Sequence, residues 1–122
     1  MTLPRVLIID DEESIRHSLA AWLEDFGFFV ETAADAESAL VLLEKQPVDA
    51  AVVDIRLPGM SGEEFILAAH EKFDRMVFLV HTGSPEFKLS QTFSLMPRVV
   101  PRVLQKPLHD LTELTREINR AL

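Results

Sequence analysis

The chain contains no cysteine, which excludes disulfide bonds, thiolate metal sites and a cysteine nucleophile and is consistent with a reducing compartment. It also lacks any apolar run near the roughly 20 residues needed to cross a bilayer. Basic residues are scarce, because 12 Lys and Arg stand against 20 Asp and Glu, for a net charge of -8. This charge disfavours non-specific binding to nucleic-acid phosphates or anionic lipid, so we expect no direct contact with nucleic acid or membrane.

The N-terminal sequence MTLPRVLIIDDEE places two acidic pairs directly after a short apolar run. It therefore lacks the charge order and the cleavage site of a secretory signal, and we expect a cytoplasmic location. From the length of 122 residues we expect a single domain spanning 1–122, with no output domain within it. At this size, folding buries roughly two-thirds of the surface of the unfolded chain, which is enough for a hydrophobic core.

Short apolar runs alternate along the chain with longer segments of helical periodicity. Gly27 is expected to end the first helix, and Asp35 to cap the second. Ser84 and Pro85 are expected to open the fourth helix, which Pro97 ends. Because crossovers between parallel strands are right-handed, five alternations predict an α/β fold with a parallel sheet and helices on both faces. The runs predicted as strands are 5–9, 28–32, 50–53, 76–80 and 102–104, the last with a proline at its entrance, as in an edge strand.

Polar side chains follow four of these five strands. In parallel sheets, ligands bind outside the carboxyl ends of the strands, where the strand order changes direction. In the order 2-1-3-4-5, which is adopted from a known example of this architecture and not deduced from the residues, the first and third strands are neighbours. The polar residues at the strand ends are Asp10 and Asp11 after the first, Asp54 after the third, Thr82 after the fourth and Lys106 after the fifth.

Three clustered carboxylates repel one another: two unit charges about 4 Å apart cost on the order of 4 kcal/mol at an effective dielectric near 20. Protonation or a cation can offset this cost, and Mg²⁺ suits the second option because it takes oxygen ligands and often completes its shell with a phosphate oxygen. Phosphoryl transfer at this edge would use Asp54 as the nucleophile, forming an aspartyl phosphate. Asp11, with Asp10 acting directly or through water, would hold the metal. Thr82 and Lys106 would each bind a phosphoryl oxygen.

Four segments in order resemble the receiver domain of two-component response regulators. The resemblance covers essentially the whole chain, and although each segment alone is a weak signal, the four in register are highly specific. It implies a flavodoxin-like fold, a five-stranded parallel sheet in the order 2-1-3-4-5 with helices on both faces. The segments are IIDDEESIR (8–16), VVDIRLPGMSG (52–62), HTGS (81–84) and QKPL (105–108).

By this resemblance, Asp54 accepts a phosphoryl group from the phosphohistidine of a sensor kinase or phosphotransfer protein. Asp10, Asp11 and the backbone carbonyl of Arg56 would join Asp54 around Mg²⁺. Arg56 and Ser84 would border the phosphoryl group and affect the lifetime of the phosphorylated state, in a direction that the residues do not reveal. The domain would be a signalling switch, with at most self-catalysed phosphotransfer and autodephosphorylation.

The phosphorylated domain would change partner binding, or form a homodimer, through the face made by the fourth helix, fifth strand and fifth helix, and so act on an output domain or effector. The resemblance also implies a cis peptide between Lys106 and Pro107. Two features depart from the family pattern. Val103 stands where many receivers carry an aromatic switch residue. The stretch from Thr82 to Lys106 is slightly longer than usual and has MPRVVPR in place of the common small-residue turn, so we expect the fourth helix and its exit, within 84–101, to be remodelled or mobile.

Two other functions are weighed against the switch. A phosphatase of the haloacid-dehalogenase type would need a second acid two residues after its nucleophile, where this chain has Arg56, and a nucleophile after its first strand. A receiver-like scaffold that is never phosphorylated agrees with Val103 but would not need the acids, Thr82 and Lys106 together.

The histidines and the single tryptophan are given structural interpretations. The four histidines show no paired metal-ligand spacing. His81 is expected to face away from Thr82 and to lie at the surface or behind the site, without a catalytic role. Trp22 lies on the apolar face of the first helix and is expected in the core.

Overall fold

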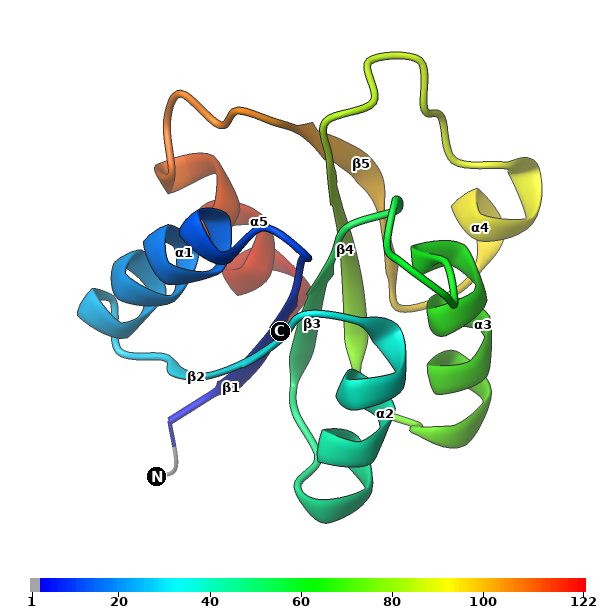
Figure 1. Cartoon of the computed structure of the whole chain (residues 1–122), viewed down its shortest axis with the longest axis horizontal. Helices are drawn as coiled ribbons and strands as arrows, with labels where there is room; N and C mark the ends of the chain where they lie inside the picture. Colours follow the sequence, from blue (N-terminus) through cyan, green and yellow to red (C-terminus); the bar gives the residue numbers. More distant parts are fainter. Residues whose placement is uncertain (1–2) are drawn as a thin grey trace.

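The computed structural model describes residues 3–122, and its five strands form one parallel sheet in the order β2-β1-β3-β4-β5 (Figure 1). The strands are β1 (Arg5–Ile9), β2 (Phe29–Ala33), β3 (Ala50–Val53), β4 (Val77–Thr82) and β5 (Val99–Gln105). The helices are α1 (Glu13–Asp25), α2 (Ala36–Lys45), α3 (Gly62–Lys72), α4 (Gln91–Leu95) and α5 (Thr112–Ala121). Helices α1 and α5 cover one face of the sheet, and α2, α3 and α4 cover the other. The predicted fold class and strand order are confirmed.

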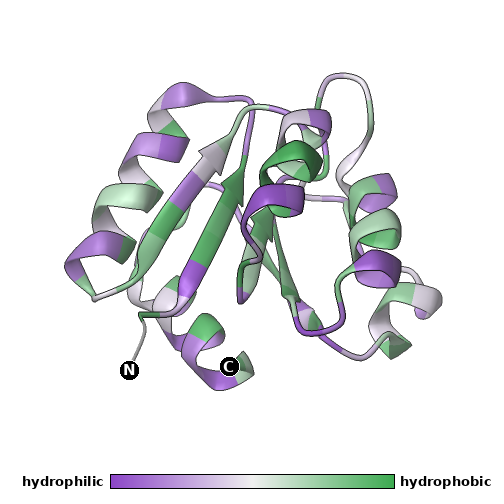
Figure 2. Ribbon diagram, turned by 90° about the horizontal axis from the view of Figure 1, so that it is seen from below, coloured by the Kyte–Doolittle hydropathy of each residue, from purple (hydrophilic) through white to green (hydrophobic). Residues whose placement is uncertain are grey.

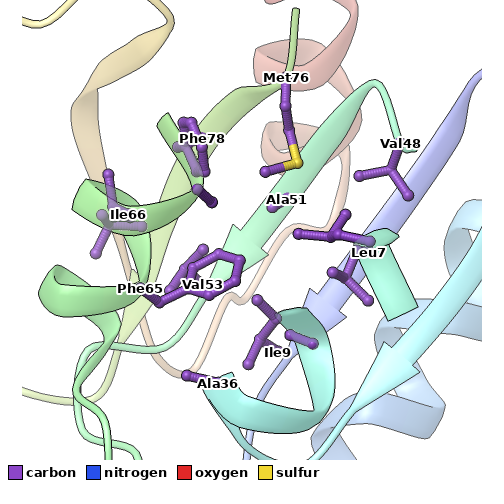
Figure 3. Close-up of a cluster of buried hydrophobic side chains, with 14 of the residues drawn as sticks. Leu7, Ile9, Ala36, Val48, Ala51, Val53, Phe65, Ile66, Met76 and Phe78 are labelled. Carbon is purple, nitrogen blue, oxygen red and sulfur yellow. The ribbon is translucent and has the colours of Figure 1, made fainter. Parts of the chain in front are cut away.

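The central strands are apolar and buried on both faces, as expected for a sheet between two helical layers. Alternate residues point into opposite layers: Leu7 and Val53 face α2 and α3, whereas Ile8 and Val52 face α1 and α5. Figure 3 shows the first layer, with Phe65 of α3 among the strand side chains. Figure 2 shows the matching pattern on the helices, whose hydrophilic residues alternate with apolar ones along the ribbon. Each such fully buried side chain contributes roughly 1.5–3 kcal/mol.

Three helix ends follow from local side-chain chemistry. Asp35 caps α2 by accepting a hydrogen bond from the backbone N–H of Ser38 at 2.7 Å, which confirms its predicted role. Gly27, with φ +87°, follows the C-terminal cap of α1 and also matches the prediction. Helix α3 begins with a capping box formed by Ser61 and Glu64, just after the Pro-Gly break.

The start predicted for the fourth helix is wrong. Ser84 and Pro85 open a turn in which the N–H of Phe87 bonds to the Ser84 carbonyl at 3.3 Å. Helix α4 begins only at Gln91, where Ser90 provides the cap, and it is five residues long. It ends before Pro97, as expected. A serine before a proline suits both a turn and a helix start, so local sequence alone does not decide between them.

The predicted β5 is too short, because the strand begins at Val99 and contains Pro101. Proline lacks an N–H for the ladder, and the structure accommodates it at the edge of the sheet, where the register between β4 and β5 shifts. Strand β4 also extends further than predicted, to Thr82.

Among the residues that the structure describes, no helix has the length and apolarity to span a membrane.

Arg98 fastens the connection between α4 and β5 to the C-terminal end of α3. Its backbone has φ +71°, and its Nη1 donates to the carbonyls of Phe73 at 2.7 Å and Met76 at 2.9 Å. Its Nη2 donates to the carbonyl of His70 at 3.0 Å, and the His70 Nε2 lies 2.7 Å from the Pro97 carbonyl. The side chains of Arg98 and His70 therefore connect the unusual segment before β5 to the end of α3.

Candidate functional site

The carboxyl ends of β1, β3, β4 and β5 meet at one edge of the sheet, around a cavity of about 460 Å³. Most of the residues that line it are polar or charged. Every predicted site residue except Asp10, which is buried, is in this lining. The lining residues are Asp11, Glu12, Asp54, Arg56, Thr82, Gly83, Ser84, Pro85, Glu86 and Lys106.

Lys106 lies at the centre of the acidic residues. Its Nζ is 2.6 Å from Asp10 Oδ2, 3.1 Å from Asp54 Oδ2 and 3.5 Å from Glu12 Oε1. Asp10 and Asp54 are only 2% and 5% exposed, so the ammonium is the main compensation for two buried charges. The structure thus brings together groups from β1, β3 and β5 that lie far apart in the sequence.

The pKa values at this centre shift in ways that follow from burial and neighbouring charges. Burial raises the pKa of Asp54, and the hydrogen bond and charge of Lys106 only partly oppose this, while the charge of Asp10 adds to it. Burial alone would lower the pKa of Lys106, but hydrogen bonds and charges from Asp10 and Asp54 outweigh burial and raise it. The Asp54 carboxylate is therefore incompletely compensated, and the site favours a further positive charge.

The turn after β1 holds three acidic side chains close together. Single carboxylate oxygens of Asp10, Asp11 and Glu12 all lie within 4.8 Å of one another, which suits a hard divalent cation. The Asp10 Oδ1 accepts a hydrogen bond from the Glu12 N–H at 2.9 Å, and the Arg16 Nη1 donates to the Asp10 carbonyl at 2.7 Å. Sequence reasoning missed Glu12 and Arg16, although both lie within the IIDDEESIR segment.

The loop after β3 explains why glycines follow Asp54. The Asp54 Oδ1 accepts a hydrogen bond from the Arg56 N–H at 3.3 Å, so the loop turns back over the carboxylate. Gly62 donates its N–H to the Ile55 carbonyl at 3.0 Å, and a Cβ on Gly62 would lie 2.2 Å from the Asp54 carbonyl oxygen. Only glycine permits this approach, which fixes the backbone of Asp54.

Glu37 of α2 supports the same loop from outside. Its Oε2 accepts a hydrogen bond from the Met60 N–H at 3.1 Å and would clash with a Cβ on Gly59, whose φ is +72°. This contact links α2 to the segment that follows Asp54. Sequence reasoning did not single out Glu37, because nothing in the local pattern of α2 indicates a partner 23 residues away.

Thr82 and Ser84 line the same cavity. Thr82 is buried at the end of β4, and its Oγ1 accepts a hydrogen bond from the Ser84 N–H at 3.2 Å. The Ser84 Oγ accepts one from the Arg56 Nη2 at 3.3 Å, which bridges the loops after β3 and β4. The peptide between Lys106 and Pro107 is cis, as the family resemblance implied.

His81 is buried in β4, which excludes the surface and leaves the other expected position, behind the site. It is 3% exposed, and its Nε2 has no hydrogen-bond partner among the described residues. Burial, helped by the charge of Lys106 and opposed by that of Asp10, lowers its pKa from 6.5 to about 4. His81 is therefore a neutral core residue at neutral pH, directly before Thr82.

Trp22 is half-buried and packs against the core layer between the sheet and helices α1 and α5, near its predicted place.

Acidification is expected to destabilise the protein through His81. Because its pKa is lower in the folded state, its contribution is present in full above pH 6.5 and is lost as the pH falls toward and below 4. The loss by pH 4 is about 3 kcal/mol relative to His81→Leu, since each pKa unit corresponds to about 1.4 kcal/mol. Urea unfolding of both proteins at several pH values measures this difference, in which the other titrating groups cancel. Parallel stability curves for the two proteins would contradict the prediction.

Comparisons with known proteins agree with this geometry. A family model described as the response regulator receiver domain matches residues 6–119. Response regulator RR06 of Streptococcus pneumoniae is 33% identical over 90 residues, which cover 74% of this chain and 42% of that protein. The signal receiver domain of an HD domain-containing protein from Pseudomonas fluorescens has a TM-score of 0.87 at 28% identity, covering 98% of this chain and 94% of the other.

A second solved structure, the chemotaxis response regulator CheY4 of Vibrio cholerae, has a TM-score of 0.82 at 32% identity, covering 99% of this chain and 100% of the other. The chain spans only 18% of an NtrX-like putative response regulator of Rickettsia bellii and 42% of RR06, so it corresponds to a part of these relatives. Taken together, the match over 6–119, the strand order and the structural similarity show that the chain belongs to the response regulator receiver domain family of two-component signalling systems.

Proposed function

We propose that this chain is a Mg²⁺-dependent phosphoacceptor, phosphorylated on Asp54 by a sensor histidine kinase or a phosphotransfer protein. The observation that carries the proposal is the position of Lys106, whose Nζ contacts both Asp10 and Asp54 at the edge of a cavity that Thr82 also lines. One ammonium, one hydroxyl and several carboxylates around a single cavity are the groups that phosphoryl transfer requires. No other group of buried charges among residues 3–122 combines these features.

Asp10, Asp11, Asp54 and the Arg56 carbonyl would hold the Mg²⁺ in this proposal. The residues fit the ion, because the turn after β1 offers three carboxylates within 4.8 Å of one another and burial leaves Asp54 short of positive charge. The sequence did not assign Glu12 to the metal, but its carboxylate belongs to this group and could contribute. When bound, the cation neutralises charge on the phosphoryl oxygens.

Phosphorylation would proceed by attack of an Asp54 carboxylate oxygen on the phosphorus of the phosphohistidine. The new O–P bond forms as the N–P bond breaks, and the electron pair of the broken bond remains on the imidazole nitrogen. Lys106 and Thr82 would bind phosphoryl oxygens, the first as a charge and the second as a neutral donor. Lys106 already contacts Asp54 Oδ2 and therefore starts next to the reacting atom.

The aspartyl phosphate would act as a switch, because it adds about -1.5 to -2 charge and several strong acceptors at the cavity. Helix α4 is short, and its Leu95 is 74% exposed, so few contacts resist its movement. The face formed by α4, β5 and α5 would then change its affinity for a second copy, an output domain or an effector. Arg56 and Ser84, which bridge the cavity, would set the lifetime of the phosphorylated state.

Intact-mass measurement after incubation with Mg²⁺ and a small phosphodonor tests the proposal. The wild type is expected to gain a single phosphoryl group, and Asp54→Asn is expected to gain none. Asp74→Asn serves as a matched control, because Asp74 is exposed and lines a groove outside this cavity. Continuous turnover of phosphoesters would indicate a phosphatase instead, and a wild type without any adduct would indicate a scaffold.

Asp54→Asn is expected to be more stable than the wild type. Because the pKa of Asp54 is raised in the folded state, its stabilising protonated form is lost as the pH rises through that value, and its charge destabilises the fold at neutral pH. Asn removes this charge, so we expect Asp54→Asn to have a higher free energy of unfolding than the wild type in urea at pH 7. A gain that is unchanged at acid pH would contradict this cause.

A further inference from the structure

Arg16 lies in the first turn of α1, and its Nη1 donates a hydrogen bond of 2.7 Å to the backbone carbonyl of Asp10. We propose that Arg16 is a positioning residue, which holds the turn that carries Asp10 and Asp11 in the geometry that binds a divalent cation. This inference rests on the proposed function, because it concerns the same Mg²⁺ site.

The start of α1 shows why the turn needs such support. Helices α2 and α3 are capped by the side chains of Asp35 and Ser61, whereas the cap residue of α1, Glu12, makes no side-chain capping bond. The first turn of α1 thus lacks a side-chain bond from its own cap residue. The Arg16 guanidinium reaches back to Asp10 and supplies a restraint from the helix side.

Asp10 is then held at each of its polar groups. Its N–H donates to the Ala33 carbonyl at 3.1 Å, which ties it to the end of β2. Its Oδ1 accepts from Glu12 and its Oδ2 from Lys106, so the Arg16 bond to the carbonyl completes the set. Loss of this bond would leave the carbonyl side of the turn free to rotate, and the directions of the Asp10 and Asp11 carboxylates would change with it.

Arg16 restrains the backbone without occupying a ligand atom. It forms no ion pair within the part of the chain that the structure describes, although three carboxylates lie in the turn beside it. A cation in the first turn of a helix is also unfavourable for the helix dipole. Both facts are explained if Arg16 binds the Asp10 carbonyl and so leaves the carboxylate oxygens of the turn free to bind a cation.

Charge and position predict opposite effects on Mg²⁺ affinity when Arg16 is removed. By Coulomb attraction alone, Arg16→Met makes the site more negative and should tighten binding of the cation. If Arg16 positions the turn, the same variant should bind Mg²⁺ about tenfold more weakly, because groups that orient metal ligands typically contribute 10–100-fold to affinity. The sign of the change therefore separates the two explanations.

Mg²⁺ titrations of the whole chain, followed by two-dimensional NMR of backbone amides, measure this affinity and show that each variant is folded. We expect Arg16→Met to bind about tenfold more weakly than the wild type. Arg16→Lys keeps the positive charge and one hydrogen-bond donor. Its Mg²⁺ affinity should therefore lie between those of Arg16→Met and the wild type. Arg75→Met is the matched control, because Arg75 is exposed after α3 and lines grooves outside the acidic cavity.

Equal or tighter Mg²⁺ binding by Arg16→Met would overturn the inference, and so would an affinity of Arg16→Lys below that of Arg16→Met. In both cases a wild type that binds Mg²⁺ would leave the proposed function intact. A wild type whose amides in the turn after β1 do not respond to Mg²⁺ would overturn the metal site and the role of Arg16 together.

Discussion

Lys106→Met is expected to lower the free energy of unfolding by about 3 kcal/mol at pH 7, because removing one partner of a buried ion pair leaves uncompensated charge. Asp10 and Asp54 are almost fully buried, and the Lys106 Nζ is the cation that contacts both. The pKa of Lys106 is raised, so its contribution is complete below 10.5 and is lost only as the pH rises through the raised value. Urea unfolding followed by Trp22 fluorescence measures the loss.

Two conditions should restore much of this stability. Acid pH protonates Asp54, whose pKa burial raises, and so removes one of the unpaired charges. Mg²⁺ would replace the missing cation and stabilise the folded state by mass action. Mg²⁺ should therefore raise the stability of Lys106→Met more than that of the wild type. Lys88→Met is the control, since Lys88 is exposed in the segment before α4. Equal unfolding midpoints for Lys106→Met and wild type would refute the argument.

Gly62→Ala is expected to reduce both stability and phosphorylation. The added Cβ would lie 2.2 Å from the Asp54 carbonyl oxygen and 2.8 Å from the Ile55 Cα, and both are backbone atoms in a packed loop. Relief of this overlap requires a backbone shift, at a cost of about 3 kcal/mol. Since the shift moves Asp54, the proposed phosphoacceptor, formation of the phosphoryl adduct should slow at least tenfold, on the order expected for an ångström-scale displacement.

Gly27→Ala separates the two effects. Gly27 has φ +87°, but a Cβ there meets nothing within 4 Å. Alanine at this position is strained by roughly 1–2 kcal/mol without touching the site, so stability should fall while the adduct forms at the wild-type rate. Time-resolved intact-mass measurement and urea unfolding give both quantities. An adduct rate for Gly62→Ala equal to that of Gly27→Ala would show that Gly62 does not position Asp54.

The sheet could be predicted because its strands are short apolar runs with clear ends. The runs 5–9 and 50–53 match β1 and β3 residue for residue, and alternation with helices implied the parallel arrangement. The region from Ser84 to β5 could not be predicted in the same way. Its helix start depends on which of two serines has room to cap, and the length of β5 depends on a register shift against β4 around Pro101. Both are decided by tertiary packing.

The site was predictable to the extent that strand ends specify it. The rule that ligands bind at the carboxyl ends of parallel strands was enough to gather Asp54, Thr82 and Lys106 around one cavity. Their chemical roles remain predictions. Arg16 and Glu37 were missed because each acts through a hydrogen bond to a backbone group. The pattern of hydrophobic residues does not predict such bonds. The sequence left His81 either at the surface or behind the site, because local pattern at the end of a strand does not decide burial.

The attachment of Arg98 to the end of α3 determines how α4 can move. Its three hydrogen bonds to carbonyls fix the exit of α4, whereas the residues between Thr82 and Ser90 form no helix or strand. If phosphorylation draws the segment after Thr82 toward the cavity, α4 would therefore rotate about its C-terminal end, which Arg98 holds in place. The largest displacement would occur at the N-terminal end of α4, and β5 would keep its register while the surface beside it changes shape.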